Sequence, residues 1–416
     1  MKILYIHQYF NSMDDIGGTR SYEFAKRFVK LGHEVDIITT YRYNDKKNKS
    51  WFSTNISGIN IHWLPIEYSN YLGYFKRFQV FLKFSVESFF RTIKLRPDLV
   101  FATSTPLTVA LPAILISRLK DIPMIFETRD LWPDIPVAMR ILKNKLLIKI
   151  AKFIESQAYK KSKFIVALSP DMKKSIVSKD IDSKKIIVIP NSSDLETLSF
   201  DTELANNFRK ERSWLKNRPL ILYAGAFGLV NDLSYAVYLA DTLIRQNSDI
   251  RILLVGDGGE KKKIIQMAKK KNVYEKNLFF EEPVSKKNIQ KYFSAATIVA
   301  NFVIDIEANW ANSANKFFDG LSAGKPILLN HGGWMKNLVL KYKCGLSMHK
   351  KRIDHVAKEL DFIVSDKAWL EKSGKASLFL AKNFFNREIH FNQLETVLHY
   401  AINNKSELPK ELYIDY

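Results

Sequence analysis

The sequence predicts an α/β protein that contains two Rossmann-like domains with parallel sheets. Short apolar runs rich in β-branched residues alternate with helical patterns along the 416-residue chain. These runs are apolar throughout, which is typical of parallel strands covered by helices on both faces. A chain of this length exceeds a single-core domain, and a hydrophobic content of 46% is ample for two cores.

The apolar runs set the expected order of strands and domains. They are "KILYIH", "EVDIITT", "DLVFAT", "PMIFE", "KFIVAL" and "KIIVIP", followed by "PLILYAG", "IRILLVG", "NLFFEE", "TIVANFV" and "PILLN". Turn residues and charges in 192–218 indicate a hinge. We expect an N-terminal domain over 1–195, a C-terminal domain over 196–385, and a segment 386–416 whose amphipathic helix packs back on the first domain. The carboxyl ends of the strands should face a cleft, where ligands bind.

Composition limits the class of protein. The single cysteine, Cys344, excludes a disulfide framework, and no pair of Cys or His residues has metal-site spacing, so we expect a reducing cytoplasm and no structural metal. The opening "MKILYIHQYF" lacks the apolar core of a signal peptide, and the best apolar run is too short to span a bilayer. The net charge of +21 leans toward the first half and favours phosphates or anionic lipid. We do not expect nucleic-acid binding, because no recognised module accompanies the basic residues.

Two loops in the first half carry candidate binding residues. Gly17 and Gly18 lead into a helix, where glycines let a diphosphate approach free N–H groups, although a plain tight turn is an alternative. The run "PMIFE" continues into "TRDLWPD", which gathers Glu127, Arg129 and Asp130. Arg and Asp together often hold hydroxyls or phosphates, and a structural pair that braces the loop is the alternative.

The second half contains the motif "NSANKFFDGLSAGKPILLN". Lys316 lies beside the start of its helix, where free N–H groups and positive potential suit a phosphate, and a solvated lysine is the alternative. Gly225 opens the first helix of the second domain, where only backbone amides are available to contact a phosphate.

Two other patterns are set aside. Gly256, Gly258 and Gly259 follow a strand but lack the spacing of a dinucleotide fingerprint, so we do not expect NAD. Asp180 and Asp182 form an Asp-x-Asp triplet that precedes a strand among lysines and serines. A solvated turn explains that triplet better than a metal-bound nucleotide sugar.

Residues 70–96 are basic and aromatic. One helical stripe is explained by ordinary core packing: Phe75, Phe78, Leu82, Val86, Phe89 and Ile93. Outside that stripe, Phe81 and Phe84 lie among the basic residues Lys76, Lys83, Arg91 and Lys94. This pattern is typical of a helix resting on an anionic membrane surface, and packing against a neighbouring helix or subunit is the alternative.

Taken in order, these segments resemble a retaining glycosyltransferase of the GT-B fold, family four. The likeness is to the bacterial branch that builds O-antigen and capsular repeat units with N-acetylated aminosugars such as fucosamine. It rests on "GGTRSYEFAKRFVKLGHEVDIITT", "TSTPLTVALPAILISRLKDIPMIFETRDLWPD", "KIIVIPNSSD", "YAGAFGLVNDL" and "NKFFDGLSAGKPIL", which span nearly the whole chain.

The resemblance implies roles for several residues. Asp319 stands where the family holds the ribose hydroxyls of the nucleotide, and Asn315 and Lys316 would then face the diphosphate and sugar. The loop with Gly17 and Gly18 would complete the phosphate site. Lys316 is a catalytic candidate because it offsets charge on the departing nucleotide, and Arg129 and Asp130 are the other two candidates.

The chain departs from the family pattern at three places. Ala311 stands where the family has a carboxylate eight residues before Asp319, which leaves Glu307 as the nearest alternative contact for the donor sugar, with Glu127 as a second. The usual Arg and Lys are missing from "AGAFGLVNDL". The cleft histidine of the family is replaced in "TRDLWPD".

The resemblance implies a metal-independent, retaining transferase without a cofactor. It would move a sugar, an N-acetylated aminosugar, from a UDP-sugar donor to a polyprenyl-diphosphate-linked glycan acceptor. Its location would be cytoplasmic and peripheral, on the anionic inner membrane surface. Two alternatives stay open: a sugar-nucleotide epimerase or phosphorylase on the same fold, and a catalytically inert binding subunit that partners an active transferase.

Overall fold

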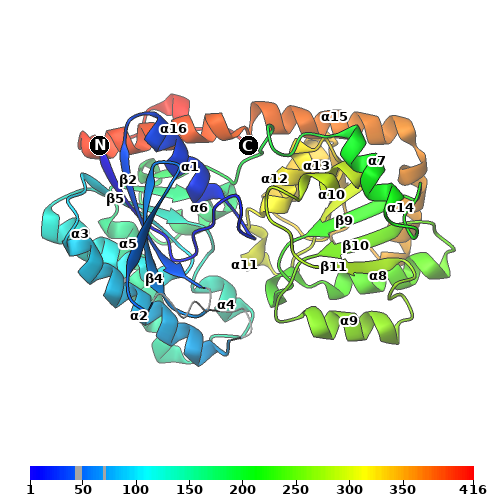
Figure 1. The fold of residues 1–416 in the computed structure, drawn as a ribbon, viewed down its shortest axis with the longest axis horizontal. Helices are drawn as coiled ribbons and strands as arrows, with labels where there is room; N and C mark the ends of the chain where they lie inside the picture. Colours follow the sequence, from blue (N-terminus) through cyan, green and yellow to red (C-terminus); the bar gives the residue numbers. More distant parts are fainter. Residues whose placement is uncertain (43–48, 69–71) are drawn as a thin grey trace. The chain divides into compact units, whose positions relative to one another are not determined.

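The computed structural model describes residues 1–42, 49–68 and 72–416. By their mutual contacts these residues form two compact units. The first contains Met1–Ser12, Thr19–Pro190 and Glu388–Asp415, and the second contains Met13–Gly18, Asn191–Arg387 and Tyr416. Each unit has its own sheet (Figure 1).

The first unit is built on an eight-stranded sheet with the order β3-β4-β2-β1-β5-β6-β7-β8. All neighbouring strands are parallel except β3 and β4, which form an antiparallel pair. The strands are β1 (Lys2–Ile6), β2 (Glu34–Tyr41), β3 (Phe52–Ile56), β4 (Ile59–Pro65), β5 (Leu99–Thr103), β6 (Met124–Thr128), β7 (Phe164–Ala167) and β8 (Ile186–Val188). Every residue of β5, β6 and β7 is buried, as expected for strands covered on both faces.

Helices cover both faces of this sheet (Figure 1). They are α1 (Arg20–Lys30), α2 (Tyr74–Ile93), α3 (Ala110–Lys120), α4 (Asp134–Ala138), α5 (Lys145–Lys161), α6 (Pro170–Val177) and α16 (Arg387–Ile402), with short 3₁₀ turns η1 (Leu107–Val109), η2 (Ser183–Lys185) and η4 (Lys410–Leu412). On one face, α3 contacts both α2 and α5.

The last helix, α16, packs against α1 within the first unit. The ring of Phe391 lies 5.0 Å from that of Phe28 and 6.5 Å from that of Phe24, measured between centroids. The exposed side of the same contact carries an ion pair of 2.7 Å between Arg27 and Glu388. The predicted return of the C-terminal helix to the first domain is confirmed.

The second unit is built on a six-stranded, all-parallel sheet with the order β11-β10-β9-β12-β13-β14. Its strands are β9 (Leu220–Ala224), β10 (Arg251–Val255), β11 (Leu278–Glu281), β12 (Ile298–Asn301), β13 (Ile327–Leu329) and β14 (Gly345–Ser347). Strands β9 to β11 are added toward one edge of the sheet and β12 to β14 toward the other, so the strand order reverses between β9 and β12. Ligands of doubly wound sheets bind at such a switch point.

Separate apolar clusters lie on the two faces of this sheet. The helices that cover them are α7 (Thr202–Lys210), α8 (Ser234–Arg245), α9 (Lys261–Lys270), α10 (Gln290–Ala295), α11 (Glu307–Trp310), α12 (Asn315–Ser322), α13 (Trp334–Tyr342), α14 (Ile353–Ser365) and α15 (Lys367–Asn383), with the 3₁₀ turn η3 (Leu229–Asn231).

Every predicted strand is present, and the α/β class with two parallel sheets is confirmed. The sequence analysis missed β3, β4 and β14, and it missed α7 inside the proposed hinge. Among the helices of the described residues, none is both long enough and apolar enough to cross a bilayer.

We expect Phe391→Ala to loosen α16 from α1. The ring is only 4% exposed, so its removal leaves a cavity that costs about 3–5 kcal/mol of unfolding free energy. Urea unfolding should report this loss, and hydrogen exchange should locate it at α1 and α16. Phe362→Ala is the control, because that ring is 73% exposed and its loss should cost about 0.5 kcal/mol or less. Equal stability of the two variants would contradict the packing described for α16.

Candidate active site

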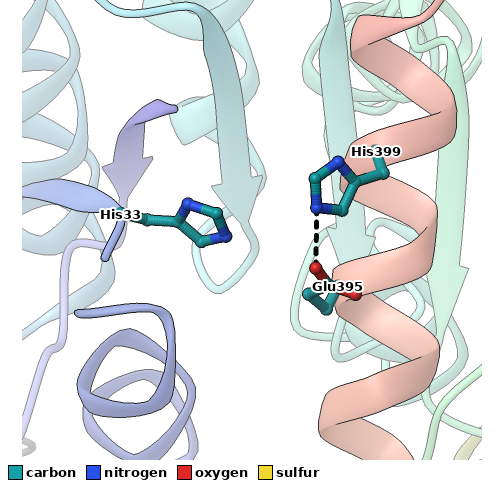
Figure 2. Close-up of side chains that lie close together, drawn as sticks. All are labelled: His33, Glu395 and His399. Carbon is teal, nitrogen blue, oxygen red and sulfur yellow. Dashed lines mark ion pairs between the residues drawn. The ribbon is translucent and has the colours of Figure 1, made fainter. Parts of the chain in front are cut away.

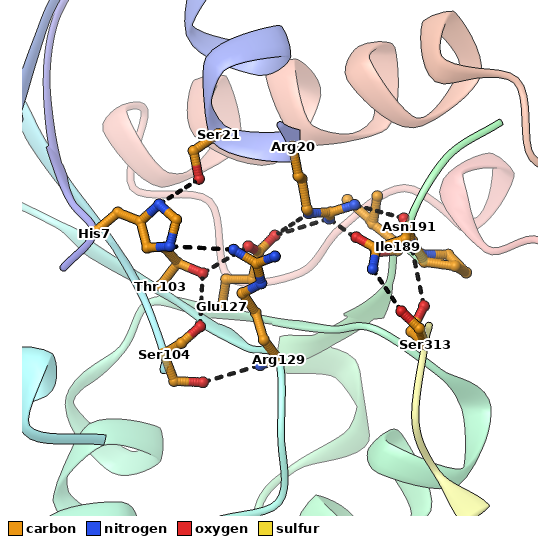
Figure 3. A network of polar contacts seen from close by, with 11 residues as sticks. His7, Arg20, Ser21, Thr103, Ser104, Glu127, Arg129, Ile189, Asn191 and Ser313 are labelled. Atoms are coloured by element: carbon orange, nitrogen blue, oxygen red, sulfur yellow. Dashed lines mark hydrogen bonds and ion pairs between the residues drawn. The ribbon is translucent and has the colours of Figure 1, made fainter. Parts of the chain in front are cut away.

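A buried ion pair organises the carboxyl edge of the first sheet (Figure 3). Arg20 is the first residue of α1, and its guanidinium contacts Glu127 Oε2 at 2.8 and 2.9 Å. The same guanidinium donates to the carbonyls of Ile189 and Pro190 beyond β8, at 2.9 and 2.5 Å. The other oxygen of Glu127 accepts from Thr103 Oγ1 at 2.7 Å. Arg20 and Glu127 together thus join α1 to β5, β6 and the end of β8.

This geometry corrects one prediction. Glu127 has no exposed surface, and both of its carboxylate oxygens are occupied within the first unit. It braces the loop after β6 and does not offer an oxygen to a donor sugar. Arg20, which the sequence analysis did not single out, is its partner. Arg20 directly follows the Gly-Gly-Thr segment, but the sequence gives no sign of a partner so far along the chain.

His7 lies at the end of β1 and is 3% exposed. Arg129 Nη1 lies 3.2 Å from its Nε2, and Ser21 Oγ lies 2.9 Å from its Nδ1 (Figure 3). An arginine can only donate, so Nε2 accepts and Nδ1 carries the proton toward Ser21. Burial holds the pKa of His7 well below its ordinary value, with help from the positive charges of Arg129 and Arg42. His7 is therefore a neutral histidine that orients Arg129.

Arg129 and Asp130 follow β6 and are partly buried. The backbone N–H of Arg129 donates to Ser104 Oγ at 3.0 Å, and Thr105 Oγ1 donates to Asp130 Oδ2 at 2.7 Å. Because β1, β5 and β6 are neighbours in the sheet, both side chains lie at the same carboxyl edge as His7. The loop is fixed by bonds to the residues after β5, so its charged groups are held in place without pairing to each other.

In the second unit, Lys316 is the second residue of α12 and is 8% exposed. Its Nζ lies 4.7 Å from the centroid of the Tyr223 ring, a cation–π contact. Burial lowers the pKa of Lys316 to about 8, and Asp319 partly opposes that shift. The lysine therefore keeps a desolvated positive charge at the start of a helix, where an anion is favoured.

Lys316 approaches the turn after β9. A Cβ at Gly225 would lie 2.8 Å from Lys316 Cε, and one at Gly256 would lie 1.9 Å from the carbonyl oxygen of Gly225. Gly256 follows β10, so the loops after two adjacent strands are in contact there. The close packing of these two loops thus explains why position 256 is a glycine, although its cluster lacks the spacing of a dinucleotide fingerprint.

Asp319 lies one turn after Lys316 and forms an ion pair of 2.6 Å with Lys286, which lies in the loop after β11. Burial raises the pKa of Asp319 above its ordinary value, and the Lys286 ammonium opposes that shift. The sequence analysis missed Lys286, which lies in an ordinary polar loop and far from Asp319 in the chain.

The start of α12 is fixed from the linker that opens the second unit (Figure 3). The backbone N–H of Asn191 donates to Ser313 Oγ at 3.1 Å, and its side-chain amide donates to the Ser313 carbonyl at 2.5 Å. These bonds hold the segment just before Lys316 and so fix the start of the helix that carries the lysine.

The remaining predicted donor residues lie on loops. Gly17 is exposed and has a φ of 132°, which favours glycine, and it belongs with Gly18 to the segment that groups with the second unit. In that segment, Asp14 pairs with Lys287 at 2.5 Å. Asn315 is exposed at the first position of α12, and Glu307 is exposed at the first position of α11.

Ala311 is 5% exposed. This buried alanine occupies the position where a carboxylate was expected from the family pattern.

The Asp-x-Asp triplet lies in a turn, where Asp182 Oδ1 accepts from the Lys184 N–H at 2.9 Å.

Helix α2 carries a stripe of apolar side chains on its exposed face. The exposed ones follow helical spacing and are Phe75 (74% exposed), Phe78 (49%), Leu82 (47%), Val86 (49%), Phe90 (61%) and Ile93 (37%). The buried face instead contains Ser85, Ser88 and Thr92 beside Phe84. Small polar residues permit close approach to the neighbouring segment, and Ser85 Oγ donates to the Thr108 carbonyl at 2.9 Å.

The prediction for this helix was therefore wrong about its faces. Phe84 is fully buried, and Phe81 is partly buried beside Tyr9 and Tyr68. Arg91 is also partly buried and contacts His62 Nδ1 at 2.9 Å, whereas Lys76 and Lys83 are exposed. Helical spacing reveals a stripe but not which side of it faces the core. Residues 70 and 71 of the segment lie outside the described residues.

Two family models match the chain, one for each half. Residues 17–197 match the model "Glycosyltransferase Family 4", and residues 205–377 match "Glycosyl transferases group 1". The chain is a family-4-like glycosyltransferase of the GT-B fold. A comparison of this glycosyltransferase with curated proteins gives no match.

Solved structures share the fold of the glycosyltransferase at low identity. Sucrose-phosphate synthase from Thermosynechococcus elongatus aligns with a TM-score of 0.77 and 16% identity over 97% of this chain and 100% of that one. Anabaena Alr3699/HepE, solved with UDP and glucose, aligns with a TM-score of 0.70 and 14% identity over 96% and 99%. WaaG, a glycosyltransferase involved in lipopolysaccharide biosynthesis, aligns with a TM-score of 0.67 and 14% identity over 92% and 95%.

We expect Glu127→Gln to destabilise the glycosyltransferase strongly. The change leaves the buried Arg20 charge without its partner, which costs about 3–5 kcal/mol. Urea unfolding measures the loss. Glu388→Gln makes the same chemical change in the Arg27 pair, where the Glu388 side chain is 59% exposed, and should cost about 1 kcal/mol or less. Similar losses in both variants would show that the buried pair does not organise the first unit.

Proposed function

We propose that the protein transfers a sugar, an N-acetylated aminosugar, from a UDP-sugar to a polyprenyl-diphosphate-linked glycan. The transfer retains the anomeric configuration, needs no metal ion, and serves the biosynthesis of a surface polysaccharide such as O-antigen or capsule. The protein acts in the cytoplasm as a peripheral protein of the inner membrane.

The observation that carries the proposal is the desolvated Lys316 at the start of α12. Its ammonium lies beside Gly225 at the carboxyl end of β9, in a turn whose missing side chain lets the lysine approach closely, and a helix start beside a cation favours a diphosphate. A cation held in a site with little water stabilises the charge that develops on a departing nucleotide diphosphate more strongly than one in solvent. Lys316 thus supplies the charge that a metal ion supplies in other transferases.

Asp319 is our candidate for the ribose hydroxyls. A carboxylate accepts hydrogen bonds from both hydroxyls only when it is ionised, and Lys286 favours the ionised form. Asn315 and Glu307 are exposed beside the same end of the sheet and would contact the sugar. Gly17 and Gly18 would add backbone N–H groups to the diphosphate.

Structural neighbours support a nucleotide sugar as donor. The Anabaena HepE fold has been solved with UDP and with UDP-glucose, and WaaG is involved in lipopolysaccharide biosynthesis. These ligands belong to those proteins, and the low identity carries only the fold. Because of these neighbours, UDP is the first nucleotide to test and a polysaccharide precursor is the first acceptor to test.

In the proposed reaction the bond from the anomeric carbon to the diphosphate breaks, and a bond from that carbon to an acceptor oxygen forms on the same face. The acceptor proton passes to the departing diphosphate, so no protein nucleophile is needed. Arg129 and Asp130 act by orienting the acceptor, because their loop is held rigidly by the residues after β5.

The outer face of α2 is the proposed membrane contact. Its exposed apolar residues continue onto α3 and α5, where they are Leu115, Leu119, Leu146, Leu147, Ile150 and Phe153. Exposed lysines accompany them, among them Lys76, Lys83, Lys145, Lys149 and Lys152. Apolar residues with flanking lysines fit the headgroup region of an anionic membrane, which is where a polyprenyl-linked acceptor is found.

The first test is calorimetric binding of UDP, GDP, ADP, TDP and CMP to the purified chain, with and without EDTA. We expect UDP to bind most tightly and EDTA to have no effect. Because the pKa of Lys316 is lowered to about 8, its charge is lost as the pH rises through that value, so UDP affinity should fall by up to about tenfold per pH unit above pH 8. The diphosphate is already fully ionised there, since its last pKa is about 6.

Variants separate this role from a structural one. Lys316→Met should lose UDP affinity and its pH dependence, while folding stability stays equal or rises because a charge is no longer buried. Asp319→Ala should also lose UDP affinity. Lys372→Met, on the exposed side of α15, is the matched control and should bind like the wild type. A chain that binds no nucleotide would favour the inert binding subunit and overturn the transferase.

For the membrane contact, we expect Phe75→Asp with Phe90→Asp to release the protein from sedimenting anionic vesicles. Each buried ring contributes about 1.5–3 kcal/mol, so the double change lowers partitioning about 100-fold or more. Both rings are exposed, so the melting temperature should not change. Phe362→Asp, on α14, is the control and should leave vesicle binding intact. Vesicle binding retained by the double variant would exclude this face.

A further inference from the structure

Three side chains that the proposed function does not use lie together in the first unit (Figure 2). His33 precedes β2, and Glu395 and His399 lie on α16. Each offers one potential ligand atom, and these atoms all lie within 4.8 Å of one another. His399 Nε2 is 2.7 Å from Glu395 Oε1, and the rings of His33 and His399 have centroids 6.0 Å apart.

The backbone fixes His33 at this place. Helix α1 ends in a Schellman motif, in which the His33 N–H donates to the Phe28 carbonyl at 3.0 Å and the Gly32 N–H donates to the Val29 carbonyl at 2.9 Å. Gly32 has the positive φ of 82° that this motif requires. The His33 ring packs 6.1 Å from that of Phe28, the apolar contact that often accompanies the motif.

The other two residues come from the opposite side. Glu395 and His399 are four residues apart on α16, so they share one face of that helix. Phe391, one turn before Glu395, packs on Phe28 and brings this face toward His33. The same aromatic packing therefore sets the distance between all three groups, although they come from opposite ends of the chain.

One nitrogen in this group lacks a partner. Within the described residues, His33 Nε2 is buried and makes no hydrogen bond, while Nδ1 on the other side of the ring lies 3.4 Å from the Met1 nitrogen. A buried polar atom without a partner costs about 1–3 kcal/mol, so it calls for an explanation. Burial also lowers the pKa of His33, which favours the neutral ring that coordinates metals.

We propose that His33, Glu395 and His399 bind a zinc ion. Two imidazole nitrogens and one carboxylate oxygen suit Zn²⁺, whereas Ca²⁺ and Mg²⁺ prefer sites built from oxygen alone. Zinc bonds of about 2.0–2.2 Å need only small side-chain rotations from the present distances. His399 is exposed, so its ring has room to turn toward the ion together with its partner Glu395. A fourth position stays open to water.

The site has a structural role. His33 precedes the amino end of β2, the edge of the sheet opposite to that of His7 and Arg129, so the ion does not meet the proposed acceptor. It would link α16 to the segment between α1 and β2. Zinc that binds only the folded chain would stabilise it by mass action. The inference is independent of the proposed transfer reaction.

The test is calorimetry of ZnCl₂ into tag-free, EDTA-treated and desalted full-length protein without nucleotide. We expect one zinc ion per chain and a melting temperature that rises with zinc. His399→Ala and Glu395→Gln should each weaken zinc affinity about tenfold or more, because each removes a direct ligand. Both residues lie toward the surface, so the melting temperature in EDTA should match that of the wild type.

His355→Gln is the matched control, because it removes an exposed histidine on α14 in the second unit. It should bind zinc like the wild type. Wild-type protein that binds no zinc would overturn the proposal. So would His399→Ala and Glu395→Gln variants that bind one zinc ion with unchanged affinity, since the ion would then lie elsewhere.

Discussion

The ion pair between Arg20 and Glu127 fixes the geometry at the carboxyl edge of the first sheet. A guanidinium taken out of water requires every donor to find an acceptor, and this one finds a carboxylate and two backbone carbonyls. The start of α1, the loop after β6 and the end of β8 are therefore positioned together. His7 and Arg129 lie at the same edge, because they follow β1 and β6, the two strands that flank β5.

The second unit buries a charge in a different way, because among the described residues no carboxylate is bonded to the ammonium of the buried Lys316. It is stabilised by an aromatic ring and by a glycine turn. Sequence reasoning found Lys316 and Asp319 because both lie in one short motif with a helix start. It did not find Lys286 or Arg20, whose roles depend on partners brought together only by the fold. It assigned Glu127 to a sugar because the sequence does not distinguish a carboxylate that is paired with an arginine from one that is available to a ligand.

The parallel strands were predictable for a physical reason, since burial on both faces leaves a continuous apolar run. Strand β3 was missed because its three central residues are exposed and polar. The faces of α2 were exchanged because hydrophobic periodicity does not distinguish a core from an outer contact surface. The cluster of His33 and His399 was invisible for a third reason: local spacing rules detect ligands within one segment, and these residues come from opposite ends of the chain.

The placement of α16 also has a consequence for biosynthesis. The first unit needs Glu388–Asp415 to cover the Phe24 and Phe28 side of α1, yet the whole of Asn191–Arg387 is translated in between. At about 5–20 residues per second, the ribosome takes on the order of 10–40 s to make that intervening segment. During that interval an almost complete first unit leaves apolar surface on α1 uncovered. Helix α16, which is translated after nearly all of the second unit, thus completes the first unit.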